Sequence, residues 1–353
     1  MKKWSGLLSI LAALLLILGI LIPVASADKA TLEKVKQAIK EKNAKWDAGE
    51  TSVSVLPDDQ FRMMLGAIFP DEPPKGARNL DMGFTAADSL DWRSNGGNYV
   101  SSVKNQGSCG SCWAFGTTAS LESLNMIVNG TPVIRSKGKV VETNLSEQEL
   151  VSCLWEQPTS DRGKCYGCEG CDPYWAYDYL VGNGVPIESC FPYTASNSAC
   201  EHLCSTGTVK IDGWSAIDPV SKDALESVVS QHPIPVGFQV YQDFQYYRSG
   251  VYSHVSGDRV GGHIVCLIGW NNNPPPEGKG KNKVTPPAYF ICKNSWGTSW
   301  GESGFFRIAQ SEIGTDVDFG ARAADFNLGV LAPPRLAKPT AVVTFWGSIK
   351  SSY

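Results

Sequence analysis

The distribution of cysteines constrains the fold of this chain more than any other feature of its sequence. All eleven cysteines among the 353 residues lie between Cys109 and Cys292. A disulfide holds two parts of a chain with their Cα atoms about 6 Å apart, so several disulfides leave few possible folds. Disulfides persist in oxidising compartments and are rare in the cytosol, so the destination of the chain decides how its cysteines are used.

The first residues are typical of an export signal. Lys2 and Lys3 precede an apolar run from Leu7 to Val24, and the run ends at the small residues of Ala25-Ser26-Ala27. This order predicts a secretory signal peptide over residues 1–27 and a secreted protein, in an extracellular, periplasmic or lysosome-like compartment. The apolar run is longer than the about 7 to 15 residues of an ordinary signal, so an uncleaved membrane anchor is the alternative.

The following residues differ from the body of the chain. Residues 28–83 contain no cysteine; they are charged and helical in pattern from Ala30 to Lys45, then rich in Pro and Asp. A cysteine-free leader before a cysteine-rich body predicts a separate pro-segment, with a linker as the alternative. The body, residues 84–328, is long enough for two packed units. Residues 329–353 form a tail to which the sequence assigns no role.

The body changes its pattern near its middle. Apolar residues recur on one helical face from Ser111 to Val128, which predicts a helix with Cys112 in its first turn. The capping box that begins at Ser146 predicts a second helix. Beyond Pro233 the chain has short β-rich runs, which predict an antiparallel sheet or barrel and therefore an α+β fold. These runs are 234–240, 250–252, 263–269, 288–293 and 304–308, with a Pro- and Asn-rich surface excursion at 271–287.

Two residues could form a nucleophile and its base. A thiol attacks a carbonyl as thiolate, and the predicted helix N-terminus at Cys112 would lower its pKa, as would a neighbouring imidazolium. The four histidines are His202, His232, His254 and His263. Only His263 follows two glycines and opens an apolar strand, where its ring could face a cleft between the halves. A histidine in such a place is also commonly structural, so the surrounding sequence must decide.

Six sequence words resemble those of the papain-like cysteine peptidases, the family of papain and the cathepsins. They are QGSCGSCWAF from Gln106, LSEQELVSC ending at Cys153, PYW from Pro173, DFQYYRSGVY from Asp243, GGHIVCLIGW from Gly261 and KNSWGTSWGESGFFRI from Lys293. The resemblance covers about residues 91–320. It implies a papain-like two-domain fold, with a helical left domain, an antiparallel β-barrel right domain and the active-site cleft between them.

The resemblance also implies a role for individual residues. Cys112 corresponds to the nucleophile, His263 to the general base and later acid, and Asn294 to the side chain that orients the imidazole. Gln106, with the amide of Cys112, corresponds to the oxyanion hole, and Trp296 to the indole that shields the hydrogen bond between His263 and Asn294. The implied reaction hydrolyses polypeptide substrates through a thioester acyl-enzyme and needs no metal or cofactor.

Within the family the sequence is most similar to cathepsin B. The words around Trp46, Gly261-Gly262-His263 and Gly304-Phe305-Phe306 carry this similarity. The chain between Cys171 and Cys190 has no room for the occluding loop of that enzyme, so we expect an endopeptidase, with a cathepsin B-like dipeptidyl carboxypeptidase as the alternative. We expect a monomeric zymogen, inhibited by its own pro-segment, whose autocatalytic maturation is favoured by acid because carboxylates that hold the pro-segment would be protonated.

The similarity also suggests how substrates are bound. The expected substrate-binding residues are Gly170, Cys171, Asp172, Pro173, Gly262, Trp296 and Asp318. Cys171 stands where the family usually has a glycine whose backbone pairs with the substrate, and its side chain puts that contact in doubt. Asp318 aligns with an acid of the cathepsin B pocket for P2, the second residue before the scissile bond. A carboxylate there would pair with arginine, whereas a solvated surface acid is the alternative.

Apart from Cys112, ten cysteines remain, an even number that suits disulfides in an exported protein. The family resemblance implies Cys109 with Cys168 and Cys153 with Cys200. Cys266 and Cys292 lie on expected neighbouring strands, as a cross-strand pair or as two buried thiols. Cys165, Cys171, Cys190 and Cys204 leave three pairings open.

The cysteines would also suit three other classes of function. The spacing of Cys165, Cys168 and Cys171 would also suit zinc or an iron–sulfur cluster, although export favours disulfides. Cys109-Gly-Ser-Cys112 could be a thiol–disulfide oxidoreductase motif, but no βαβ pattern surrounds it. A catalytically inactive papain-fold binding protein would usually lack the nucleophile. Nucleic acid is excluded as a partner, because the net charge is −4 and no basic block is present.

Overall fold

A computed structural model of the chain describes residues 31–70, 86–155, 165–201, 208–278 and 283–327. The expected export signal, the C-terminal tail and Cys204 lie outside these residues. Within them, no helix has the length and apolar character needed to cross a membrane.

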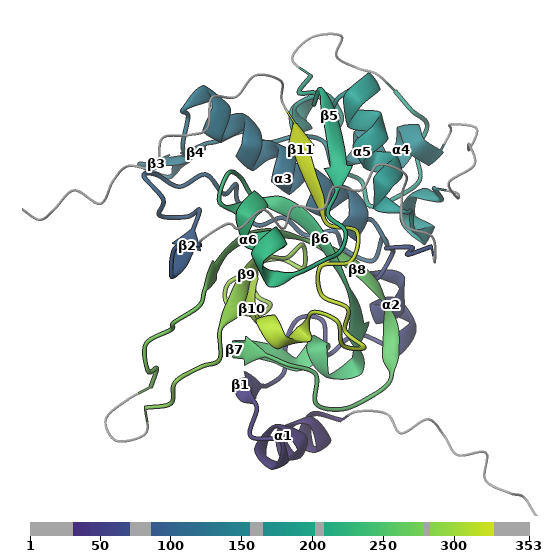
Figure 1. The fold of residues 1–353 in the computed structure, drawn as a ribbon. Helices are drawn as coiled ribbons and strands as arrows, with labels where there is room; N and C mark the ends of the chain where they lie inside the picture. The colour runs from purple at the N-terminus through teal and green to yellow at the C-terminus, as the bar shows by residue number, and fades with distance from the viewer. Residues whose placement is uncertain (1–30, 71–85, 156–164, 202–207, 279–282, 328–353) are drawn as a thin grey trace, which may run out of the picture.

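Three helices build the upper half of the molecule in Figure 1: α3 (Cys112–Asn129), α4 (Glu147–Trp155) and α5 (Pro173–Gly182). The predicted helix agrees with α3 to within one residue at each end. The hydroxyl of Ser146 accepts the N–H of Glu149 at 3.1 Å, so Ser146 caps the start of α4, while its own N–H donates to the carbonyl of Pro186 and the capping box is not completed. Helix α3 is buried along most of its length and packs against α4, α5 and the sheet of the other half.

The lower half is a seven-stranded sheet in the order β1-β7-β10-β9-β8-β2, with β6 paired to β8. Its strands are β1 (Lys45–Ala48), β2 (Ser89–Asp91), β6 (Ile234–Tyr241), β7 (Tyr247–Tyr252), β8 (Arg259–Asn271), β9 (Tyr289–Lys293) and β10 (Phe305–Ala309). All pairs are antiparallel except β7 with β10. Each of the five predicted runs overlaps one of these strands, and the predicted α+β class is confirmed.

Smaller elements complete the two halves. They are α6 (Lys222–Val229), the paired strands β5 (Gly213–Ala216) and β11 (Ala324–Asn327), the hairpin of β3 (Ile134–Ser136) and β4 (Lys139–Val141), and the short helices η1 (Gly167–Glu169), η2 (Glu188–Cys190), η3 (Gln242–Tyr246) and η5 (Gln310–Glu312). Helix α6 packs on β8, and β5 packs on α5.

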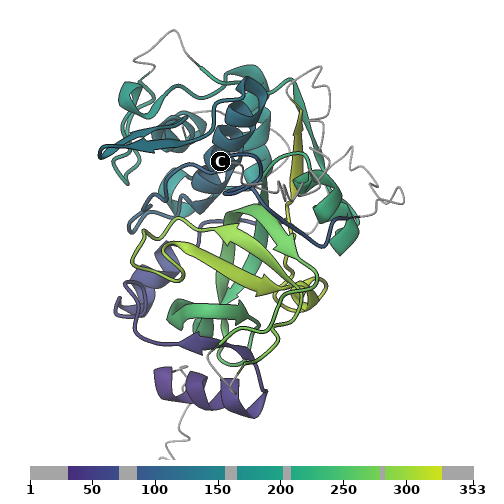
Figure 2. The same cartoon turned by 90° about the vertical axis from the view of Figure 1, so that its left-hand side faces the viewer.

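Each half has its own apolar core, and the halves lie one above the other in Figure 2. They approach most closely where α3 crosses β8. A Cβ atom on Gly116 of α3 would lie only 2.5 Å from Cγ2 of Ile264 in β8, so this crossing requires glycine. The close approach brings the start of α3 beside the middle of β8.

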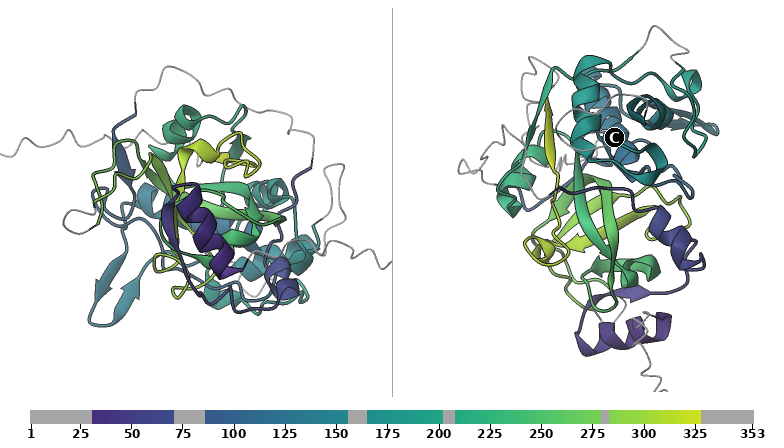
Figure 3. Two further views of the ribbon diagram at one scale, coloured as in Figure 1. Left: turned by 90° about the horizontal axis from the view of Figure 1, so that it is seen from below. Right: turned by 90° about the vertical axis from the view of Figure 1, so that its right-hand side faces the viewer.

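Residues 31–70, which we call the N-terminal segment, run along the surface of both halves. The segment contains α1 (Leu32–Glu41), β1 and α2 (Asp58–Met63). Strand β1 pairs with β7 at the edge of the sheet, α1 lies at that end of the molecule, and α2 lies near the boundary between the halves (Figure 3). The indole of Trp46 is buried against the sheet, and its Nε1 donates to the carbonyl of Ser253 at 3.0 Å.

Candidate active site

Cys112 is the first residue of α3, so its thiol lies at the N-terminus of an 18-residue helix. The partial positive charge of a helix N-terminus favours a thiolate. The side chain is fully buried, however. Burial raises the pKa of Cys112 to about 11, although the backbone N–H groups of Ile264 and Gly66 act in the opposite direction. The thiol therefore stays protonated while it is covered in this way.

His263 lies in β8, and its Nε2 is 2.8 Å from Oδ1 of Asn294, the residue after β9. The indole of Trp296 packs against the imidazole, with 4.8 Å between the ring centres, and both side chains are buried. Burial lowers the pKa of His263 to about 4, and the hydrogen bond to Asn294 opposes this shift. Nδ1 of His263 has no hydrogen-bond partner among the described residues.

Cys112 and His263 come from different halves and are neighbours at the crossing of α3 and β8. The amide of Ile264, which follows His263, contacts the Cys112 thiol. Ile264 also packs on Gly116, one turn further along α3. The buried thiol at the helix N-terminus thus contacts the strand that carries the imidazole, and Asn294 holds Nε2 of that imidazole; this arrangement is suited to nucleophilic catalysis.

The side chain of Gln106 is held so that its amide N–H groups have a fixed direction. Ser295 Oγ donates to Gln106 Oε1 at 2.7 Å. Nε2 then donates to the carbonyl of Cys109 at 2.7 Å and to the carbonyl of Met64, in the N-terminal segment, at 2.9 Å. Fixed donors of this kind stabilise negative charge on an oxygen, and here the carbonyl of Met64, in the N-terminal segment, takes the donor that Cys109 does not use.

Tyr193 ties Gln106 to the start of α3. Its hydroxyl donates to the backbone carbonyl of Gln106 at 2.9 Å and lies 2.6 Å from the hydroxyl of Ser111. The sequence singled out neither Tyr193 nor Ser295. Ser295 lies within a word that carries the family resemblance, but Tyr193 is distant in sequence and is brought to the site only by the fold.

Apart from Cys112, the described cysteines of the helical half are in disulfides. The structure contains the disulfides Cys109–Cys168, Cys153–Cys200 and Cys165–Cys171. Cys190 is disulfide-bonded as well. Cys112, Cys266 and Cys292 are free and buried, so the last two form no cross-strand pair.

These pairings leave no thiols for the alternative sites. Cys165, Cys168 and Cys171, which have ligand spacing, are all in disulfides. In the part of the chain that the structure describes, no group of His, Cys, Asp and Glu could hold a metal ion. Cys109 is bonded to Cys168, so it does not form a redox pair with Cys112.

The end of the N-terminal segment lies directly over Cys112 and His263. The N–H of Cys171 donates to the carbonyl of Gly66 at 2.8 Å, and its carbonyl accepts from Ile68 at 3.0 Å. On the other side, Ala67 N–H donates to the carbonyl of Gly262, beside His263, at 3.1 Å. The backbone of Cys171 therefore does pair with a peptide strand, and the doubt raised by its side chain is removed for this segment.

The remaining expected binding residues surround the same strand. Gly170 has φ 115°, a conformation that favours glycine, and Asp172 caps α5, with Pro173 as its first helical residue. Asp318 is partly buried, which raises its pKa, while the guanidinium of Arg322 opposes this shift. Arg322 Nε lies 3.7 Å from Asp172 Oδ1. A substrate arginine would meet Arg322 here, which argues against the arginine preference expected from Asp318.

Comparisons with known proteins agree with this geometry. The model of the family described as papain family cysteine protease matches residues 86–320. The chain is 34% identical over 284 residues to cysteine proteinase COT44 of Brassica napus, covering 76% of each chain. Among solved structures, digestive procathepsin L2 of Tenebrio molitor aligns with a TM-score of 0.67 at 26% identity, over 84% of this chain and 89% of that one. ProCathepsin B S9 of Trypanosoma congolense has a TM-score of 0.67 at 20% identity, over 85% and 99% of the chains, and shares the fold.

Proposed function

The chain belongs to the papain family of cysteine proteases, and we propose that it is the zymogen of a secreted endopeptidase with Cys112 as nucleophile and His263 as general base. The observation that carries this proposal is the position of residues 64–68. They lie over both residues and use the backbone of Cys171 and the amide of Gln106. A segment bound in this way prevents a substrate from reaching the same groups.

The proposed reaction follows from these residues. His263 takes the proton of Cys112, and the thiolate attacks the substrate carbonyl. The resulting oxyanion is stabilised by Gln106 Nε2 and the amide of Cys112. His263 then protonates the leaving amine, so the peptide bond breaks and a thioester remains. Water, deprotonated by His263, attacks the thioester, releases the acid and restores the thiol, while Asn294 holds the imidazole throughout.

Latency follows from burial as well as from blockage. Beneath the N-terminal segment the neutral forms of Cys112 and His263 are favoured, because burial raises the pKa of the thiol and lowers that of the imidazole. Departure of the segment would return water to both groups. The helix N-terminus at Cys112 and the amide of Asn294 would then favour the thiolate–imidazolium pair.

Two features support an endopeptidase over a dipeptidyl carboxypeptidase. Helix α5 begins at Pro173, two residues after Cys171, so the described chain here has no insertion that could close one end of the cleft. No histidine, which could bind a substrate carboxylate, occurs between Cys171 and Cys190. The resemblance to cathepsin B thus bears on the ancestry of the chain, and we do not extend it to exopeptidase activity. Product analysis with a long peptide, free or amidated at its C-terminus, distinguishes the two activities.

Phe69 suggests which side chains the cleft accepts. A Cβ atom on Gly237 or Gly262 would lie 2.7 or 3.1 Å from its ring, so these glycines leave room for the ring. The guanidinium of Arg322 lies 5.9 Å from the ring centre. An apolar or aromatic side chain suits this pocket better than a cation.

An epoxide that alkylates papain-type thiolates tests the proposal. We expect stoichiometric labelling of Cys112 after removal of the N-terminal segment and slow labelling before it, because the thiol is covered and protonated in the full chain. Mass spectrometry of peptides locates the label. Labelling of Cys266 or Cys292 instead, or equal rates before and after removal, would contradict the proposed zymogen.

Gly66→Ala should weaken latency. A Cβ atom on Gly66 would lie 1.7 Å from the carbonyl oxygen of Gly110, so the segment must move away from Cys112. We expect the epoxide to label the full-length chain about tenfold faster. This factor corresponds to a loss of roughly 1.4 kcal/mol in the free energy with which the segment docks. Gly49→Ala is the matched control, because its Cβ would meet only the flexible side chain of Arg248. Equal rates in both variants would show that residue 66 does not hold the segment in place.

Maturation favoured by acid stays a prediction. Most contacts described above are backbone hydrogen bonds, which do not titrate. Among carboxylates, Asp47 Oδ2 accepts a hydrogen bond from Ser249 Oγ at 3.2 Å where β1 pairs with β7. Self-processing followed on gels between pH 4 and pH 8 measures the effect.

A further inference from the structure

The disulfide Cys165–Cys171 lies at the strand that pairs with the bound peptide segment. The N–H and the carbonyl of Cys171 both form hydrogen bonds to the N-terminal segment, at 2.8 and 3.0 Å. The side chain of Cys171 is fully buried and points away into the bond with Cys165. A single residue thus has its backbone in the cleft and its side chain in a covalent link.

The chain between the two cysteines would be loose without such links. Gly167 and Gly170 both have positive φ angles, 61° and 115°, which glycine adopts at little cost and from which it also escapes easily. Three backbone hydrogen bonds close the turn: from Tyr166 N–H to the carbonyl of Gly170 at 2.7 Å, from Glu169 N–H to the carbonyl of Tyr166 at 3.1 Å and from Gly170 N–H to the carbonyl of Gly167 at 3.2 Å. The disulfide joins the two ends of this turn.

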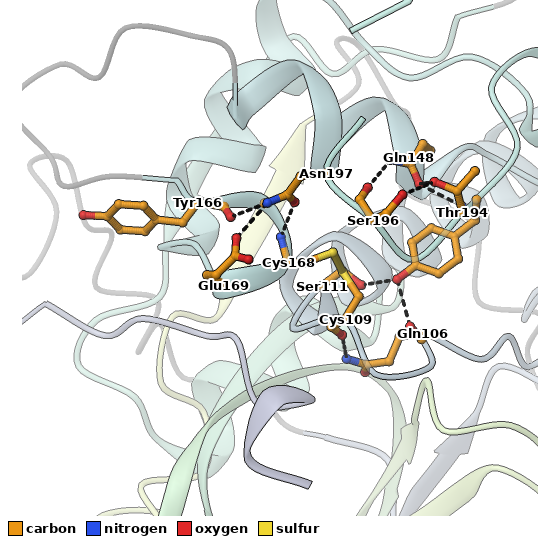
Figure 4. The surroundings of a disulfide bond; sticks show 12 residues. Gln106, Cys109, Ser111, Gln148, Tyr166, Cys168, Glu169, Thr194, Ser196 and Asn197 are labelled. Carbon is orange, nitrogen blue, oxygen red and sulfur yellow. Dashed lines mark hydrogen bonds between the residues drawn. A yellow bond between two sulfur atoms is a disulfide. The ribbon is translucent and has the colours of Figure 1, made fainter. Parts of the chain in front are cut away.

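A second set of contacts fixes the middle of the turn. Cys168 forms the disulfide with Cys109, and its carbonyl accepts from Gly110 N–H at 2.8 Å, two residues before the nucleophile. Asn197 Oδ1 accepts from Cys168 N–H at 2.7 Å, and its Nδ2 donates to Glu169 (Figure 4). These contacts hold the turn to the loop before α3. None of them involves Cys171, which is joined to the start of the turn by its disulfide with Cys165.

We propose that Cys165 and Cys171 are positioning residues, whose disulfide holds the backbone of Cys171 in the geometry that pairs with peptide substrates. The proposal rests on the proposed function, because it assumes that a substrate binds in the position that residues 66–68 occupy here. It assigns a role to a cysteine where the family usually has glycine. A fixed strand loses less conformational entropy when a substrate binds, so the disulfide should strengthen binding without changing the chemical step.

The test compares two substrates of the matured enzyme. A blocked tripeptide amide reaches Cys171, whereas a single-residue ester with a free amino group has no second residue to pair with it. In Cys165→Ala/Cys171→Gly we expect KM of the tripeptide to rise about three- to tenfold, the range of one or two hydrogen bonds, with kcat within twofold. KM of the ester should not change. Titration of active sites with the epoxide gives the concentration of folded enzyme, so that kcat and KM refer to folded enzyme alone.

Cys153→Ala/Cys200→Ala is the matched control, because it removes another disulfide of the helical half, one that does not touch the N-terminal segment. This variant should have a lower Tm and unchanged KM values for both substrates. If the double variant of the proposed pair yields no titratable sites, Cys165→Ala alone serves, with the same expected rise in KM. Unchanged KM for the tripeptide, or an equal loss of kcat for both substrates, would overturn the proposal. A wild-type enzyme that neither binds the epoxide nor cleaves either substrate would instead refute the proposed function.

Discussion

Cys112→Ser should lower kcat/KM by at least about 10⁴-fold and leave the full-length chain folded but uncut. A hydroxyl has a far higher pKa than a thiol, so the helix N-terminus and His263 cannot stabilise an alkoxide as they stabilise a thiolate. The residual rate would come from substrate binding and from the hydrogen-bond donors of Gln106, as it does in enzymes that have lost one member of a catalytic triad. A fluorogenic peptide measures the rate after the segment has been removed by a trace of wild-type enzyme.

The matched control for this substitution is Cys266→Ala. Cys266 is a free, fully buried thiol like Cys112, but it lies in β8 and accepts a hydrogen bond from Ser120 at 3.4 Å. Its loss leaves a small cavity, so we expect a cost of about 1 kcal/mol in stability with activity retained. Equal loss of activity in both variants would mean that general damage, and not the loss of a nucleophile, explains the result.

The sequence was sufficient for those parts of the fold that local patterns determine. Helix α3 and the strands around His263 were predicted because core-facing residues repeat with the period of a helix or a strand. Residues that the fold brings together from distant parts of the chain were not predicted. Tyr193 meets Gln106, and Arg322 meets Asp172, only through packing between segments that the periodicity cannot relate. The pairing of Cys165 with Cys171 was one of three possibilities, because spacing does not determine which thiols approach each other.

The sequence patterns also did not predict a group of buried charges beneath the site. This group is the basis of the second prediction. Lys104 Nζ lies 2.9 Å from Glu122 Oε1 and 2.7 Å from Glu147 Oε1, and both carboxylates are buried. Lys293, the residue before Asn294, lies 3.9 Å from Glu122. The four residues are far apart in sequence, and each alone would be read as a surface charge.

Lys104→Met should lower the free energy of unfolding by about 3 to 5 kcal/mol, the cost of breaking a buried ion pair by removing one partner. Burial alone would lower the pKa of Lys104, but Glu122 and Glu147 outweigh it and raise the pKa, so the lysine is charged and stabilised by both. Denaturant unfolding of the full-length chain in the Cys112→Ser background, which excludes self-cleavage, gives the value. Lys36→Met removes a surface pair, because Lys36 is 47% exposed and its partner Glu33 is 81% exposed, and should cost less than about 1 kcal/mol.

A second substitution can separate the loss of charge from the loss of packing. Burial raises the pKa of Glu147 and Lys104 opposes this shift, so the charged form of Glu147 depends on Lys104; Glu122 keeps a lowered pKa because Lys104 and Lys293 outweigh its burial. Lys104→Met/Glu147→Gln removes the charge that Lys104→Met leaves without a partner, while Glu122 retains Lys293. The double variant should therefore regain at least about 1 kcal/mol over Lys104→Met, a coupling within the range of contacting pairs. No recovery would mean that Lys104 stabilises the chain through its packing between the two halves.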